Sequence, residues 1–143
     1  MQDPNDVVEV FRQHGLRVTP QRKAIFDAVH QAGGHVTVEA IFEHVRVRMP
    51  TISLKTVYET LHSLAIVGQV QKLDVGPGSM RFDKTVRPHH HLICLSCHRM
   101  EDVDIEVKPL AASERRGFSI SFADVIAWGV CPDCNGDPRV VSS

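Results

Sequence analysis

The hydrophobic positions of the first 68 residues recur with the spacing of amphipathic helices. A first helix is followed by a second, which begins after the N-cap residue Thr19 and ends at Gly33-Gly34. Thr37 and Ser53 are the predicted N-caps of a third and a fourth helix, and Gly68 closes the fourth. The apolar residues predicted to form the buried helix faces are Val7, Val8, Phe11, Ile25, Ala28, Val29, Val38, Ile41, Phe42, Val45, Leu54, Val57, Leu61 and Leu64.

Polar and apolar residues alternate after the fourth helix, which is the pattern of strands. Gln69–Asp74 and Ser79–Asp83 are two such runs, and Gly76-Pro77-Gly78 between them is a strong turn signal. Helices followed by a hairpin form the layout of a winged helix-turn-helix. The hairpin therefore predicts a winged-helix unit over residues 1–83.

The composition changes from about Lys84 and predicts a second, smaller unit over residues 84–143. Its short apolar runs alternate with turn residues, so strands and a helix are both expected. The sequence thus predicts an α+β protein whose second unit is a small α/β domain. The expected elements of that domain are strands at His89–Leu95 and Glu101–Asp104, a helix at Pro109–Arg116, and one or two strands within Ser119–Val130.

The charge of the chain carries no global signature of nucleic-acid binding. The net charge is -1, and residues 1–80 hold eight Lys/Arg against eight Asp/Glu. DNA binding would therefore require a local patch, or a dimer that presents two of them. The longest apolar stretch, Val125–Cys131, is far shorter than the ~20 residues that span a bilayer. The polar, acidic opening does not resemble a signal peptide, so we expect a cytoplasmic protein without a membrane partner.

All four cysteines fall in two Cys-x-x-Cys pairs, Cys94/Cys97 and Cys131/Cys134, with 33 residues between the pairs. Four thiolates from two such knuckles can surround one zinc ion tetrahedrally. Disulfides and a reactive dithiol are the alternatives, which the expected cytoplasmic location and the neighbouring strands disfavour. The spacing therefore predicts one structural Zn²⁺ per chain, without an open coordination position.

A run of three histidines immediately precedes the first cysteine pair. On a strand, its first and last imidazoles lie on one face and the middle one on the other. One aspartate ends the predicted hairpin, another lies on the next predicted strand, and a further histidine lies in the loop after the second helix. Together these residues form a candidate site of three imidazoles and two carboxylates, made of His35, Asp83, His89, His91 and Asp102.

Such a nitrogen and oxygen ligand set suits Fe²⁺ or Mn²⁺ better than tetrahedral zinc, and its two carboxylates would offset the charge of the cation. The alternative is that the histidine run is a solvated turn and that His35 is an ordinary loop residue. Composition alone leaves both interpretations open.

Four longer motifs surround these candidates. They are Leu-Arg-Val-Thr-Pro-Gln-Arg at 16–22, Ser-Leu-Lys-Thr-Val-Tyr at 53–58, His-His-His-Leu-Ile-Cys-Leu-Ser-Cys at 89–97 and Cys-Pro-Asp-Cys at 131–134. These motifs and their order along the chain resemble those of the ferric uptake regulator (Fur) family. The resemblance extends from about Val8 to Cys134. The resemblance implies a dimeric, metal-sensing repressor with a winged helix, a dimerisation domain, and a regulatory metal held by residues of both domains.

The resemblance also implies a homodimer on a palindromic, AT-rich operator in double-stranded DNA, with no small organic substrate and no enzymatic activity. It makes Tyr58 the base-reading residue and places Arg17 and Arg22 near the DNA backbone or minor groove. From the residues themselves, Lys55 can reach a phosphate, and the helix N-terminus behind Ser53 offers backbone N–H groups. Thr56 lies on the same outer face, although all of these residues would also suit a solvated surface.

Within the family the sequence is most similar to the peroxide-responsive (PerR) branch. The aspartates at 83 and 102 carry that similarity, because iron-uptake regulators usually have glutamate at the first position. It implies peroxide sensing by metal-catalysed oxidation of the ligands His35 and His89. Glu59 departs from the arginine or asparagine common in relatives, so it must accept from a cytosine amine or point away from DNA.

Three other functions remain open. A metalloenzyme would use the histidine and aspartate cluster to activate water, but neither a general base nor a substrate-pocket motif is evident. A zinc-stapled adaptor would bind protein through its helical half. Within the family, the alternative is an iron- or zinc-uptake repressor that senses metal availability only.

Overall fold

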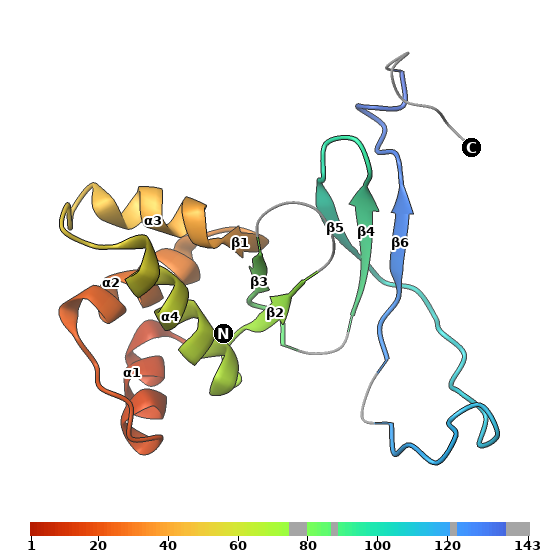
Figure 1. Ribbon diagram of the computed structural model, residues 1–143, viewed down its shortest axis with the longest axis horizontal. Coiled ribbons are helices and arrows are strands. Elements are labelled where there is room, and N and C mark those ends of the chain that lie inside the picture. Colours follow the sequence, from red (N-terminus) through yellow and green to blue (C-terminus); the bar gives the residue numbers. More distant parts are fainter. Residues whose placement is uncertain (75–79, 87–88, 121–122, 137–143) are drawn as a thin grey trace. The chain divides into compact units, whose positions relative to one another are not determined.

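The computed structural model describes residues 1–74, 80–86, 89–120 and 123–136 of the chain (Figure 1). The chain divides into two compact units, Met1–Val86 and Arg87–Ser143, a division three residues beyond the predicted boundary at Asp83. The predicted turn Gly76-Pro77-Gly78 lies outside the described residues. Among the residues described, none of the helices is both long and apolar enough to cross a membrane.

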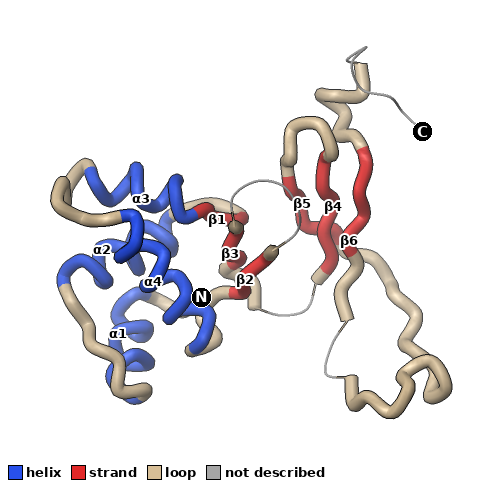
Figure 2. Tube along the Cα trace, in the orientation of Figure 1, coloured by secondary structure: helices blue, strands red, loops and turns tan. Residues whose placement is uncertain are grey.

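The first unit contains all the helices of the described chain, drawn in blue in Figure 2. Each predicted N-cap hydroxyl accepts a backbone N–H: Thr19 from Arg22 at 3.2 Å, Thr37 from Ala40 at 3.1 Å, and Ser53 from Thr56 at 3.1 Å. These bonds satisfy N–H groups that a helix start leaves without an intrahelical partner. The helices are α1 (Pro4–Gln13), α2 (Pro20–Gln31), α3 (Val38–Arg46) and α4 (Leu54–Ile66).

The core of the first unit lies among these helices and confirms most of the predicted apolar faces. Phe11 packs edge-on against Phe26 with ring centroids 4.7 Å apart. The prediction was wrong for Leu54, which is 46% exposed because the first residue of α4 precedes the turn that enters the core. Thr60 takes an inward position instead, and its hydroxyl donates to the Thr56 carbonyl at 2.7 Å, which satisfies the buried group.

A small antiparallel sheet of order β1-β3-β2 completes the winged helix (Figure 1). The predicted hairpin strands are shorter than expected, β2 (Gln71–Leu73) and β3 (Arg81–Asp83). The loop predicted for His35 is wrong, since His35–Thr37 forms β1 and pairs with β3. Gly34, with φ +62°, turns the chain from α2 into this strand, a conformation that favours glycine. A three-residue strand is too short to show an alternating pattern.

The second unit is built on a sheet of order β5-β4-β6. Its strands are β4 (His90–Cys94), β5 (Met100–Val103) and β6 (Ile126–Gly129). β4 lies in the centre, antiparallel to β5 and parallel to β6. The region predicted to hold one or two final strands contains only β6 among its described residues.

The helix predicted at Pro109–Arg116 is absent, and the segment forms hydrogen-bonded turns. Its residues are exposed, including Leu110 at 47%. A short helix gains most of its stability from burying an apolar face, and this segment has none buried. In its described residues the second unit is therefore formed of strands, turns and loops, without the predicted α element.

Candidate metal centres and nucleic-acid interface

The four cysteine sulfurs converge at one end of the β4–β6 sheet. Each lies within 4.8 Å of the others, and the Sγ atoms of Cys97 and Cys131 are 3.7 Å apart. A tetrahedral zinc ion with sulfurs at ~2.3 Å requires sulfur separations of about 3.8 Å. The cluster therefore fits zinc in both donor type and spacing, and none of the cysteines is in a disulfide.

Backbone N–H groups donate hydrogen bonds to the first of these sulfurs and favour its thiolate form, which is the form that binds a metal. Cys94 Sγ accepts from the amides of Cys97 at 3.5 Å and Cys131 at 3.4 Å. The amides of Cys97 and Cys131 lower the pKa of the Cys94 thiol to about 6. The Ser96 hydroxyl lowers the pKa of Cys134, but the thiol of Cys131, burial and the remaining thiols outweigh it and raise that pKa to about 12. The raised pKa of Cys134 means that a nearby cation would favour its thiolate form.

The first knuckle is closed by the backbone around His98. The His98 amide donates to the Cys94 carbonyl at 2.9 Å, and the Cys94 amide donates to the Arg99 carbonyl at 2.9 Å. His98 has φ +60°, in the left-handed region where non-glycine residues are uncommon and histidine is enriched. This turn directs the chain from Cys97 back into β5.

In the first unit, His35 and Asp83 face each other across the β1–β3 ladder. Nε2 of His35 lies 3.2 Å from Oδ2 of Asp83, and the Asp83 side chain is buried at 3% exposure while that of His35 is 10% exposed. The other carboxylate oxygen of Asp83 accepts from the Thr85 amide at 2.8 Å. Two candidate ligands that are 48 residues apart in sequence thus meet because β1 joins the sheet.

Lys84 supports this pair, a role that the sequence did not suggest. Its ammonium donates to the carbonyls of His30, at 3.2 Å, and of Ala32. These carbonyls end α2, where a cation also complements the helix dipole. Lys84 therefore ties the segment that leads to His35 to the segment that carries Asp83.

In the second unit, His89, His91 and Asp102 form a corresponding group. His91 lies opposite Asp102 in the β4–β5 ladder. Nε2 of His91 is 3.6 Å and Nε2 of His89 is 3.4 Å from Oδ1 of Asp102, while the two imidazole centroids are 4.5 Å apart. His91 is 1% exposed and Asp102 is 48% exposed. As the alternation predicted, the first and third histidines of the run lie on one side.

His90 lies on the other side of β4 and binds the backbone of the residue before β6. Its Nδ1 accepts the Val125 amide at 2.9 Å, and the His91 amide donates to the Val125 carbonyl at 3.0 Å. Because Nδ1 accepts, the neutral ring of His90 carries its proton on Nε2. These two bonds fasten the residue before β6 to the strand that carries His91.

The outer face of α4 carries most of the predicted DNA-binding residues. The hydroxyls of Ser53 and Thr56 lie 2.9 Å apart at its start. Tyr58 is 38% exposed and stacks on His62, with centroids 6.2 Å apart. Lys55 pairs with Glu59 at 3.7 Å one helical turn later. This pair was not anticipated, although lysine and glutamate at i and i+4 are its usual signal.

The two predicted arginines lie near the start of α2. Arg22 donates to the Arg17 carbonyl at 2.6 Å, and its guanidinium lies 5.7 Å from the ring centroid of Phe11. These contacts hold Arg22 in place on the winged-helix unit, where its fork retains further donors.

The family model of the ferric uptake regulator family matches residues 13–126. The chain belongs to this family. It is 40% identical over 134 residues to the transcriptional regulator FurA of Mycobacterium tuberculosis, covering 91% of this chain and 90% of FurA. It is 33% identical over 134 residues to the peroxide operon regulator of Bacillus subtilis, covering 91% and 92% of the two chains.

Solved structures of Fur-family proteins have the same fold. The ferric uptake regulator of Helicobacter pylori superposes with a TM-score of 0.73 at 20% identity, covering 97% of this chain and 93% of the other. PerR of Streptococcus pyogenes has a TM-score of 0.54 at 29% identity, covering 94% of each chain. The fold is thus a winged helix followed by the dimerisation domain of the family, with a cysteine cluster suited to zinc.

These relations establish the general function. The chain is a metal-dependent transcriptional regulator of the Fur family, whose members bind DNA, act as dimers and are not enzymes. Both the metalloenzyme and the protein-binding adaptor considered from the sequence are thereby set aside. The relatives include FurA and peroxide regulators, so the signal that this chain senses is the subject of the proposal below.

Proposed function

We propose that this Fur-family chain is a cytoplasmic repressor that binds DNA as a homodimer with Fe²⁺ or Mn²⁺ and releases it on peroxide oxidation. The observation that carries the proposal is a histidine facing an aspartate across a strand pair in each unit, His35 with Asp83 and His91 with Asp102. Each pair presents a nitrogen and an oxygen ligand from neighbouring strands. That ligand chemistry suits iron or manganese.

A structural zinc on Cys94, Cys97, Cys131 and Cys134 is the first part of the proposal. The sulfur spacing supports it, and four thiolate ligands leave no coordination position for a substrate or an oxidant. Zinc bound to thiolates in the reducing cytoplasm would close the second unit. Its role is therefore to hold the domain together, separately from sensing.

The regulatory site is the second part, and we assign to it His35, Asp83, His89, His91 and Asp102. Neither unit alone supplies enough of these ligands for a six-coordinate ion, since the first offers two and the second three. Sharing one ion would give five protein ligands with two carboxylates. A metal that needs both units would favour one arrangement of the two and couple metal binding to DNA binding.

The sensing chemistry follows from the ligands. The five assigned residues would hold the ion, and Fe²⁺ bound there, unlike Mn²⁺, would supply the chemistry that splits the O–O bond of peroxide. One peroxide oxygen would add to a ring carbon of His35 or His89, which would be oxidised by two electrons overall, and the other oxygen would leave as water. An oxidised imidazole would be a weaker metal ligand. The thiolates would be spared because zinc already holds them.

The third part of the proposal is the DNA-binding surface, which we call the reading head. We assign the outer face of α4 to the major groove, with Tyr58 against a base. Phosphates would be contacted by Ser53, Lys55 and Thr56, and the DNA backbone or minor groove by Arg17 and Arg22. The N-terminal N–H groups of α4 favour an anion at that end. Two such heads in a homodimer would read the half-sites of a palindromic, AT-rich operator.

A second candidate is a repressor that senses iron or zinc availability alone. The likeness to a relative named for ferric uptake favours it, because ferric uptake regulation protein 2 of Mycolicibacterium fortuitum is 36% identical over 139 residues and the B. subtilis peroxide regulator 33% over 134. The two candidates share the metal sites and the DNA interface. They differ in the response of the iron-loaded protein to peroxide.

The deciding experiment measures DNA binding by the purified protein loaded with Fe²⁺ or Mn²⁺ without oxygen, before and after about one equivalent of peroxide. We expect both forms to bind the operator and only the iron form to release it. Mass spectrometry should find one added oxygen on the peptides that carry His35 and His89 in the iron form alone. Retention of DNA by the iron form, or release that tracks cysteine oxidation and zinc loss, would favour the metal-uptake candidate.

A further inference from the structure

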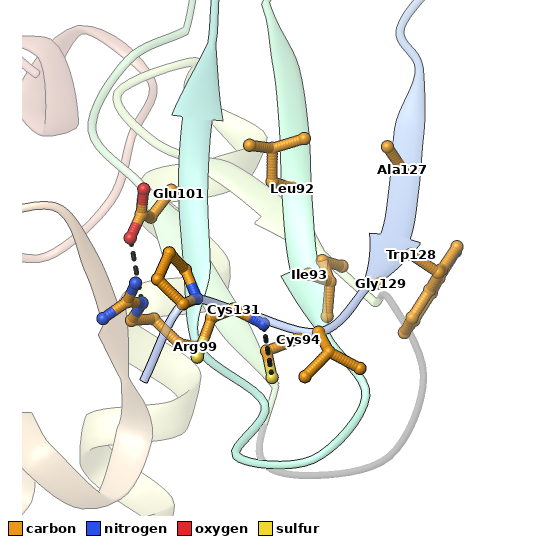
Figure 3. Close-up of a pocket in the computed structure, with 11 residues that line it drawn as sticks. Leu92, Ile93, Cys94, Arg99, Glu101, Ala127, Trp128, Gly129 and Cys131 are labelled. Carbon is orange, nitrogen blue, oxygen red and sulfur yellow. Dashed lines mark hydrogen bonds and ion pairs between the residues drawn. The ribbon is translucent and has the colours of Figure 1, made fainter. Parts of the chain in front are cut away.

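Arg99 links the two cysteine knuckles to the sheet. Its Nε lies 2.9 Å from Oε1 of Glu101 on β5, and its terminal nitrogen donates to Oδ2 of Asp133 at 2.7 Å. Its carbonyl accepts the amide of Cys94. Figure 3 shows the guanidinium of Arg99 paired with Glu101 beside Cys131.

The contact to Asp133 is the long-range one. Asp133 stands between Cys131 and Cys134 in the second knuckle, whereas Arg99 follows the first knuckle by two residues, 34 positions away in sequence. A planar guanidinium that contacts two carboxylates at once fixes both in direction, which an ammonium does less well. Arg99 thus joins β5 and both halves of the cysteine cluster through one side chain.

The charge of Arg99 also complements the cluster. Four thiolates around a divalent ion carry a net charge of about -2, and a neighbouring cation offsets part of it. An arginine guanidinium is always cationic in proteins, and here it also lies beside the carboxylates of Glu101 and Asp133. A groove of about 330 Å³ opens beside the cluster, and Arg99, Glu101, Cys94 and Cys131 are among the residues that line it (Figure 3).

We propose that Arg99 is a positioning residue for the cysteine cluster, which holds the second knuckle closed through Asp133 and so slows the loss of zinc to chelators and oxidants. The inference rests on the proposed structural zinc. Arg99 and Asp133 are 41% and 79% exposed, and such surface pairs add little to global stability. The effect should therefore appear in local opening of the knuckle and not in the unfolding of the whole chain. Residues that orient metal ligands typically change metal affinity about 10- to 100-fold.

The test measures the rate of zinc transfer from the full-length protein to a chromogenic chelator, with and without peroxide. Arg99→Met should release zinc about 10-fold faster than wild type. Asp133→Asn, which keeps the shape of the side chain, should match it, and the double variant should be no faster than either single one. Arg99→Lys, which keeps the charge but loses the fork, should fall between wild type and Arg99→Met. Arg46→Met is the matched control, because Arg46 makes an exposed pair with Glu43 at 3.1 Å in the first unit.

The outcomes separate this inference from the function it rests on. Wild-type protein without zinc would overturn the zinc site and the role of Arg99 together. Normal zinc content with release rates of Arg99→Met and Asp133→Asn within about twofold of wild type would overturn the role of Arg99 alone. Additive effects of the two substitutions would overturn the tether between them, because residues that act through one contact are not additive.

Discussion

The two candidate metal centres differ in how the chain assembles them. The cysteine cluster is drawn entirely from the unit Arg87–Ser143, from two knuckles whose sulfurs lie within 4.8 Å of one another. The candidate histidine and aspartate ligands are divided in sequence, with His35 and Asp83 in the first unit and the other three in the second. A ligand set within one unit stabilises that unit. A divided set can instead report on the arrangement of two units.

The ligand types agree with this division of roles. Thiolates bind zinc tightly and leave no open position, which suits a permanent structural ion. Imidazoles and carboxylates bind Fe²⁺ and Mn²⁺ more weakly and leave room for a further ligand, which suits a reversible signal. The comparison therefore predicts that the two centres can be disrupted independently, with different consequences.

The largest expected effect comes from breaking the cysteine cluster. Cys131→Ser should reduce the zinc content from about one ion per chain to almost none and abolish the cooperative unfolding of the second unit, since structural zinc contributes on the order of 10 kcal/mol to folding. Elemental analysis and thermal denaturation followed by circular dichroism measure both. Ser113→Ala, an exposed change in the same unit, is the control. Wild-type stability in a zinc-free variant with all four cysteines changed to serine would remove the structural role.

An intermediate effect is expected from the divided set. Asp102→Asn keeps the shape of a half-exposed side chain and removes one anionic ligand, so it avoids the cavity that truncating the buried His91 would leave. We expect it to remove most of the metal-stimulated increase in operator affinity, roughly 5- to 150-fold in wild type, while zinc is retained.

The matched control for that variant is Asp104→Asn, an exposed aspartate just beyond β5. Fluorescence anisotropy with labelled operator, in manganese and in chelator, measures the metal-dependent change in affinity for both variants. Equal losses in the two variants would point to a general charge effect. Full metal stimulation in Asp102→Asn would show that Asp102 is not a ligand.

The smallest expected effect concerns the reading head, which should respond without any change in the metal centres. Glu59 pairs with Lys55 at 3.7 Å and, with α4 in the proposed position on DNA, would place a negative charge near the phosphates. Glu59→Gln should free Lys55, raise operator affinity by about 0.5–1 kcal/mol, and steepen the salt dependence by about one counterion.

Glu43→Gln is the control for this variant, since Glu43 makes a similar exposed pair with Arg46 on α3. Anisotropy titrations over a range of salt concentrations measure both the affinity and the slope. A loss of about 1–3 kcal/mol, confined to operators with a cytosine at one position, would show instead that Glu59 accepts from the cytosine amine.

Local sequence signals predicted most of the first unit. Each N-cap side chain accepts a hydrogen bond from a backbone amide only three residues later, so the start of a helix can be predicted from local sequence. The caps that act in this way are Thr19, Thr37 and Ser53. The helix predicted at Pro109–Arg116 failed for the complementary reason. Its sequence pattern suits a helix, but the segment buries no apolar face. A short helix is not stable in water without such burial.

By itself, the sequence determined the side-chain types of the two candidate sites and the likeness to the Fur family, because side-chain chemistry and motif spacing are properties of the chain. Only the tertiary structure decided that His35 lies on a strand opposite Asp83, and that Arg99 reaches Asp133 in the other knuckle. These contacts join residues 48 and 34 positions apart. Which distant residues meet depends on the pairing and register of strands. A three-residue strand such as β1 has too few side chains for its pairing partner to be predicted from the sequence.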